Sequence, residues 1–124
     1  MAQAAIKQMV DMEPEADAAP AIDRVHLARM TFGDRGLERE LLELFDRQAA
    51  ILLARMQTAD AATVATLAHT LKGSALGVGA SFVAQAAAAV EQAGDAAERE
   101  PATDRLAAAV AAARACIATL LRAF

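Results

Sequence analysis

Alanine dominates the apolar residues of this chain, and that excess restricts the fold more than any other feature of the sequence. Hydrophobic residues make up 56% of the 124 positions, but aromatic residues make up only 3%, and Trp and Tyr are absent. Alanine has the highest helix propensity of all residues, and the β-branched residues that favour strands are sparse. The composition therefore predicts an all-α protein.

The charge balance argues against one class of partner. The chain carries a net charge of −4 at pH 7 and contains no run of Lys or Arg, so it lacks the basic surface that nucleic-acid binding requires. The single cysteine, Cys116, lies in an apolar helical pattern and is expected to act as a small hydrophobic residue, which suits a reducing compartment.

No stretch of the sequence has the pattern of a targeting or membrane segment. The N-terminal residues reach acidic positions before any long apolar run, unlike a secretory signal. The apolar stretch 106–124 is interrupted by Arg114 and Arg122, so it is a poor bilayer span. We therefore expect a cytoplasmic protein with no membrane contact.

Apolar residues at helical spacing divide the chain into one short and four long helices. We expect a leader at residues 1–21, either mobile or partly helical, and one domain over residues 22–124. Within this domain a polar loop is expected at 94–101, and the expected helices cover residues 22–30, 37–56, 61–76, 81–92 and 101–121. Short connections between such helices predict an antiparallel four-helix bundle, with the short helix capping one end.

The first long helix has apolar residues on more than one side. The widest apolar arc predicts that its core face consists of Leu37, Leu41, Leu44, Phe45, Ile51, Leu52 and Met56. Leu42 and Leu53 then fall near the outward side, where they either pack under the N-terminal segment or join a docking patch with Leu76 and Phe82. Because no long exposed heptad is evident, we expect a monomer.

The next helix carries a histidine that a core does not explain. Its apolar residues Val64, Leu67, Ala68, Leu71, Ala75 and Val78 share one arc, and His69 lies roughly 150° from the centre of that arc. His69 is therefore expected to face water. Mostly small side chains and one cation surround it at helical spacing, namely Ala62, Ala65 and Thr66 before it and Lys72, Gly73 and Leu76 after it.

These residue types suit phosphoryl transfer. An exposed imidazole is largely neutral near pH 7, so one ring nitrogen keeps a lone pair for nucleophilic attack. Lys72 supplies a positive charge one turn away, and Gly73 leaves the same face uncrowded. The alternative interpretation of His69 is a surface histidine with no function.

Other kinds of site find no support in the sequence. His26 and His69 have no metal-ligand spacing, so we assign no metal and no cofactor to the chain. Sequence patterns for a P-loop, a dinucleotide fold or a hydrolase triad are also missing. We therefore do not expect an enzyme with its own ATP site.

The run His69-x-x-Lys72-Gly73, followed by Gly79-Ala80, resembles the signature of the histidine-containing phosphotransfer (HPt) domain family. The resemblance covers roughly residues 22–124, because it extends to Ile22-Asp23, Phe32-Gly33-Asp34, Leu41 to Phe45 and Val90-Glu91. It implies that His69 accepts a phosphoryl group from a receiver-domain aspartate, or from a sensor or hybrid histidine kinase, and passes it to another receiver aspartate.

The resemblance also assigns roles around the histidine. Lys72 would stabilise the phosphate charge and Gly73 would give steric clearance, while the receiver would bring Mg²⁺, an acidic cluster and a catalytic lysine. The residues expected to contact the receiver are Ala62, Ala65, Thr66, Leu76, Phe82 and Gln85. Glu91 could either orient the imidazole N–H or repel phosphate, and both roles stay open here.

Two alternatives to a carrier remain. The chain could be a binding module that sequesters a receiver or another protein without carrying phosphate. It could also be the phosphoacceptor module of a larger chemotaxis-type kinase.

Overall fold

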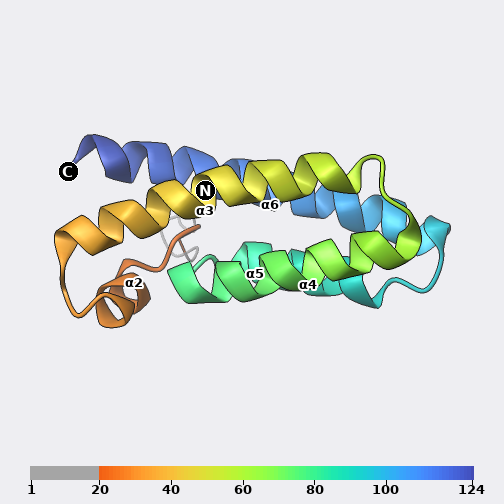
Figure 1. Cartoon of the computed structure of the whole chain (residues 1–124), viewed down its shortest axis with the longest axis horizontal. Helices are drawn as coiled ribbons and strands as arrows, with labels where there is room; N and C mark the ends of the chain where they lie inside the picture. The colour runs from red at the N-terminus through yellow and green to blue at the C-terminus, as the bar shows by residue number, and fades with distance from the viewer. Residues whose placement is uncertain (1–19) are drawn as a thin grey trace, which may run out of the picture.

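The computed structural model describes residues 20–124, and Figure 1 shows their helices as an elongated bundle. The helices of this range are α2 (Arg24–Met30), α3 (Arg35–Met56), α4 (Ala61–Val78), α5 (Ser81–Gln92) and α6 (Ala96–Arg122). Contacts join α3 to α4, α4 to α5, α5 to α6 and α6 back to α3, while α2 packs on α4. This arrangement confirms the predicted all-α four-helix bundle with a short capping helix. Residues 1–19, most of the expected leader, lie outside the described residues.

Four aspartates set the starts of four helices. Asp23, Asp34, Asp60 and Asp95 each precede a helix, and their Oδ1 atoms accept backbone N–H bonds from His26, Leu37, Thr63 and Glu98 at 3.1, 3.0, 2.8 and 2.9 Å. A side-chain oxygen at this position satisfies an amide that has no partner within the helix. The predicted starts of α2, α3 and α4, at residues 22, 37 and 61, lie within two residues of the observed ones.

The start of α6 differs from the prediction. The expected loop at 94–101 is wrong, because Asp95 and Glu98 form a reciprocal cap in which Gly94 N–H donates to Glu98 Oε1 at 2.6 Å. Pro101 consequently lies inside the helix. Its ring removes the amide that would bond to the Ala97 carbonyl, but both residues are exposed, so water can take the place of that amide.

The corner between α4 and α5 is built on a glycine in the left-handed region. Gly79 has φ 81°, and its carbonyl accepts the Asp23 N–H at 2.9 Å. A Cβ at Gly79 would lie 2.9 Å from the Asp23 carbonyl oxygen, so no side chain fits there. This close approach ties the segment before α2 to the end of the histidine-bearing helix α4.

The core confirms the predicted face of α4 and corrects that of α3. All six apolar residues predicted for the core face of α4 are buried. On α3 the prediction is right for Phe45, Leu52 and Met56, which are buried together with Glu38, Leu42 and Ala49, and wrong for Leu37, Leu44 and Ile51. Leu42 is fully buried and Leu53 partly so, whereas Leu37, Leu44 and Ile51 are 38%, 54% and 58% exposed.

The error on α3 has a physical reason. Apolar residues cover more than half of the circumference of this helix, so the pattern permits two inward faces, and the packing of α4 and α6 selects one of them. Leu37, Leu44 and Ile51, spaced seven residues apart, are left at the surface. Among residues 20–124, none of the helices is long and apolar enough to cross a membrane.

Candidate functional site

His69 lies in the middle of α4 and points away from the bundle core. Its side chain is 67% exposed, whereas its neighbours Ala68 and Leu71 are completely buried. The regular period of α4 produces this contrast, because a helix that buries one arc must direct the opposite arc to solvent. The structure thus confirms the outward position that was predicted for the imidazole.

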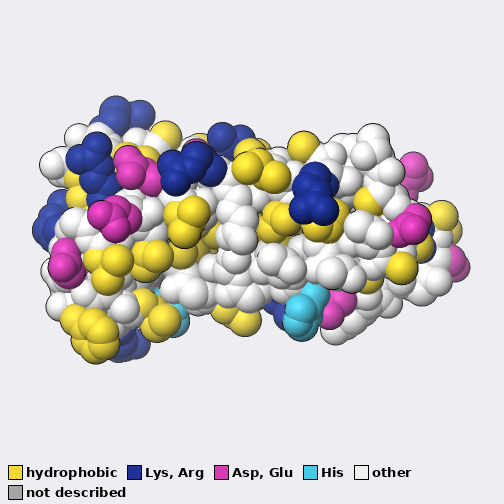
Figure 2. All heavy atoms as spheres, viewed as in Figure 1, with side chains coloured by type: hydrophobic (Ala, Val, Ile, Leu, Met, Phe, Trp, Pro, Cys, Tyr) yellow, Lys and Arg dark blue, Asp and Glu magenta, His cyan; other side chains and the backbone are white. Residues whose placement is uncertain are grey.

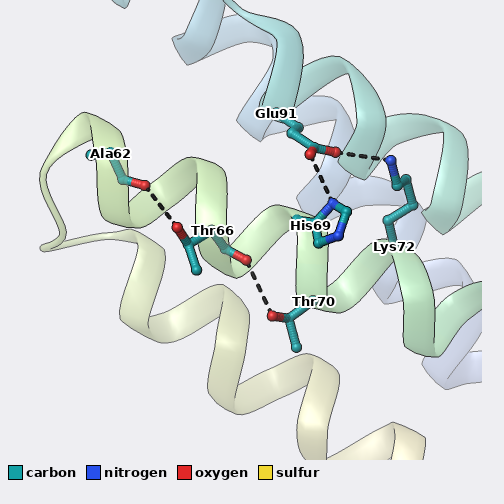
Figure 3. A network of polar contacts seen from close by, with 6 residues as sticks. All are labelled: Ala62, Thr66, His69, Thr70, Lys72 and Glu91. Atoms are coloured by element: carbon teal, nitrogen blue, oxygen red, sulfur yellow. Dashed lines mark hydrogen bonds and ion pairs between the residues drawn. The ribbon is translucent and has the colours of Figure 1, made fainter.

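A carboxylate from α5 joins His69 to Lys72. Glu91 Oε2 lies 2.8 Å from His69 Nδ1, and Glu91 Oε1 lies 3.0 Å from Lys72 Nζ (Figure 3). The side chains of Glu91 and Lys72 are both about 30% exposed, at 28% and 30%. One carboxylate on α5 therefore contacts both of these α4 side chains.

The electrostatics of this cluster keep Glu91 ionised. Its hydrogen bond to Lys72 is the main cause that lowers the pKa of Glu91 from its ordinary value, and the contact with His69 lowers the pKa further, while partial burial opposes both. An ionised carboxylate only accepts hydrogen bonds. The proton shared with Glu91 therefore belongs to Nδ1 of His69.

This assignment leaves Nε2 as the unprotonated nitrogen of the neutral ring. Nε2 points away from the Glu91 carboxylate (Figure 3), and the ring is largely in solvent. A lone pair on an exposed nitrogen is a competent nucleophile. The geometry thus separates the two nitrogens into one that is held by the protein and one that is available to a reacting group.

The surface around the ring has a shallow hollow. A hollow beside the imidazole is lined by Ala65, Thr66, His69, Thr70 and Glu91. The hydroxyls of Thr66 and Thr70 donate to the carbonyls of Ala62 and Thr66, both at 3.2 Å, so they are turned back onto the helix (Figure 3). A Cβ at Gly73 would meet no heavy atom within 4 Å, so the fold itself does not require glycine there.

The structure brings only part of the predicted site together. His69, Lys72 and Gly73 share the outer side of α4, and His69 and Lys72 meet through Glu91. Of the six residues predicted to contact a receiver, Ala65 is half-buried and the others are exposed, with Leu76 at 55% and Phe82 at 43%. The sequence placed Glu91 beside the motif, but a contact between residues 22 positions apart required the packing of α5 on α4.

The second histidine does not extend the site. His26 lies on α2 and is half-buried, and its Nε2 has no hydrogen-bond partner. Within the described part of the chain, no group of three or more His, Cys, Asp or Glu side chains is placed to hold a metal ion.

Comparison with known proteins gives one match. Residues 38–122 match the family model described as the Hpt domain. The matched range runs from the first turns of α3 to the end of α6 and contains His69, Lys72 and Glu91. Comparisons with curated proteins and with solved structures found no match to this chain.

Proposed function

Because this chain belongs to the Hpt domain family, we propose that it is a phosphorelay carrier in which His69 accepts a phosphoryl group and passes it to a receiver-domain aspartate. Membership of the family gives the chain a phosphotransfer role in two-component signalling. The observation that supports His69 as the carrier is its contact with Glu91, which holds Nδ1 and leaves Nε2 as the nitrogen that a partner can reach in an exposed ring.

The transfer step follows from this geometry. The Nε2 lone pair attacks the phosphorus of a receiver aspartyl phosphate, the new N–P bond forms, and the P–O bond to the aspartate breaks. The aspartate leaves as a carboxylate with the electron pair of that bond. The ring keeps its Nδ1 proton and gains positive charge, which Glu91 stabilises from 2.8 Å. The reverse sequence transfers the group to the next receiver.

Lys72 provides charge for the phosphoryl oxygens. Its ammonium has three N–H donors. One can stay on Glu91 Oε1 at 3.0 Å while another turns toward a phosphoryl group on His69, one helical turn away. Such pre-positioned charge is the main contribution a protein makes to phosphoryl transfer.

The partner completes the chemistry in this proposal. The bundle contributes the nucleophile and one cation, so the receiver or the kinase must supply the remaining charges, including Mg²⁺. Exposed residues on both sides of His69, among them the small Ala62 and Thr66 and the larger Leu76, form the surface that the partner would approach. The chain then acts as a carrier and needs no ATP site of its own.

Phosphoryl transfer to a His69→Gln variant tests the assignment. A receiver phosphorylated in the presence of Mg²⁺ should lose its label to the wild-type chain, and the label should be acid-labile and alkali-stable, as in a phosphoramidate. His69→Gln should accept no label and should keep its helicity, while the control His26→Gln should accept it normally. Full transfer to His69→Gln would refute the assignment.

The same variant separates a carrier from a binding module. A module that only sequesters receivers would bind them equally well with and without His69, and the substitution would have no effect on signalling. A carrier loses its signalling role with His69 even where receiver binding is preserved.

A further inference from the structure

An exposed apolar stripe runs along α3, on a side of the bundle that the phosphotransfer chemistry does not use. Leu37, Leu44 and Ile51 repeat every seven residues and are 38%, 54% and 58% exposed. They span about 21 Å along the helix axis at 1.5 Å per residue. Figure 2 shows hydrophobic side chains at the surface along this helix, with charged side chains beside them. Residues spaced seven apart lie on one side of a helix, so these three leucine and isoleucine side chains offer a narrow apolar face to a second helix.

The stripe borders an apolar groove between α3 and α4. Leu41 and Gln48 lie one turn from the stripe toward α4 and are half-buried. With Met30, Phe45 and Val78 they line a groove of about 230 Å³, which also includes Leu44 itself. A large side chain that packs beside Leu44 can therefore enter a preformed apolar hollow rather than rest on a flat surface.

The charges on the other border of the stripe indicate what covers it. Glu40 and Arg47 are both exposed on the side away from α4, and among the described residues neither forms an ion pair. When two copies of one helix pack antiparallel, the same border of each copy faces its counterpart. With the crossing point at Leu44, Glu40 of each copy then meets Arg47 of the other.

We propose that α3 pairs with α3 of a second copy of this chain in an antiparallel, two-fold symmetric dimer. Leu44 packs on Leu44 at the axis, and Leu37 of each copy packs on Ile51 of the other, so one patch is complementary to itself as two-fold symmetry requires. A parallel pair would set Glu40 and Arg47 opposite the other border of the stripe, at Leu41 and Gln48, and would leave both charges unpaired.

The contact is limited to a few turns of one helix, so the dimer is a weak one that depends on protein concentration. Its surface adjoins α4 at Ser74 and Gly77, on the α3 side of the histidine-bearing helix. The proposal does not depend on phosphorylation of His69, since no residue of the stripe belongs to that site.

Sedimentation equilibrium of the full chain, from about 1 μM to 1 mM, tests the proposal. The wild type should show a reversible monomer–dimer equilibrium. Leu44→Asp should weaken dimerisation at least tenfold and leave helicity and Tm nearly unchanged, because Leu44 is already 54% exposed in the monomer. Val25→Asp changes a residue that is 62% exposed outside the stripe and should not affect the equilibrium.

A charge swap tests the antiparallel register. Glu40→Arg and Arg47→Glu should each weaken the dimer by placing like charges together, and the double variant should restore it. Failure of the double variant to recover would overturn this register, and a chain that stays monomeric up to 1 mM would overturn the dimer. Methyl NMR of Leu44 and Ile51 gives two further outcomes that would overturn the dimer. One is a contact of these methyl groups with Ile6, Met9 or Val10 of the same chain, and the other is a shift of their signals only when a receiver is added.

Discussion

Replacing Gly73 by Ala should stabilise the bundle and slow phosphoryl transfer at the same time. A Cβ at Gly73 meets no heavy atom within 4 Å, so the new methyl group causes no clash in the free protein. Glycine inside a helix is less favourable than alanine by about 0.8–1.0 kcal/mol. For a domain of this size, that difference raises the Tm by roughly 4–6 °C.

The Gly73→Ala substitution should slow phosphoryl transfer because it hinders the approach of the partner. Positions 69 and 73 are neighbours on the helix surface, with roughly 5–6 Å between the Cβ atoms of such a pair. A methyl group at position 73 therefore stands beside the path to Nε2 of His69. Displacement of reacting atoms by about 1 Å can slow a reaction on the order of 100-fold. We expect transfer to slow by roughly 10- to 100-fold.

Two measurements on the same sample decide this prediction. Thermal unfolding followed by circular dichroism gives the Tm, and single-turnover transfer of label from a phosphorylated receiver gives the rate. Gly77→Ala is the matched control, because its Cβ also meets open space but lies two turns beyond His69. It should gain similar stability and transfer at nearly the wild-type rate. A Gly73→Ala protein that is more stable and still accepts label at the wild-type rate would contradict the clearance argument.

Two further predictions concern the corner glycine and the carboxylate. Gly79→Ala should lower the free energy of unfolding by at least about 2 kcal/mol in denaturant titrations, because a Cβ would approach the Asp23 carbonyl to 2.9 Å and φ is 81°. Gly33→Ala, at φ 76° with no atom within 4 Å, should cost only about 1–2 kcal/mol, and equal losses in both variants would contradict the close-approach argument. The lowered pKa of Glu91 means that its stabilising contribution is present above its unfolded pKa and is lost as the pH falls through its folded pKa. An NMR titration of the Glu91 carboxyl carbon should therefore show a midpoint below 4.5 that moves upward in Lys72→Gln, and an unchanged midpoint would show that Lys72 does not hold the carboxylate.

The sequence was sufficient to predict the buried face of a helix where its apolar residues allow only one such face. On α4 the apolar residues occupy a single arc, so both the buried face and the outward direction of His69 were predicted correctly. The starts of α2, α3 and α4 were predicted to within two residues, and each is set locally, by an aspartate side chain and the amide three residues later.

The sequence was insufficient where the outcome depends on contacts between distant segments. Residues such as Leu42 and Leu44 are equivalent in hydrophobicity, and only the positions of the neighbouring helices place one in the core and the other at the surface. The helix α6 starts before Pro101, although proline usually marks the first turn of a helix, because its cap contains a second hydrogen bond between Gly94 and Glu98. The contact of Glu91 with His69 likewise depends on how α5 packs against α4.

In the carrier that we propose, this contact favours the orienting role of Glu91 over the repelling one. A lone carboxylate beside the ring would repel an incoming phosphoryl group, but Glu91 is paired with Lys72 at 3.0 Å, so the two charges offset each other at Nε2. The orienting effect on Nδ1 then remains without the repulsion. A neutral side chain at position 91 would release Lys72 toward phosphate but would also cease to hold the Nδ1 proton. If His69 accepts phosphate as we propose, these two opposed effects explain how a carboxylate can lie beside it, provided that a lysine is within reach of both.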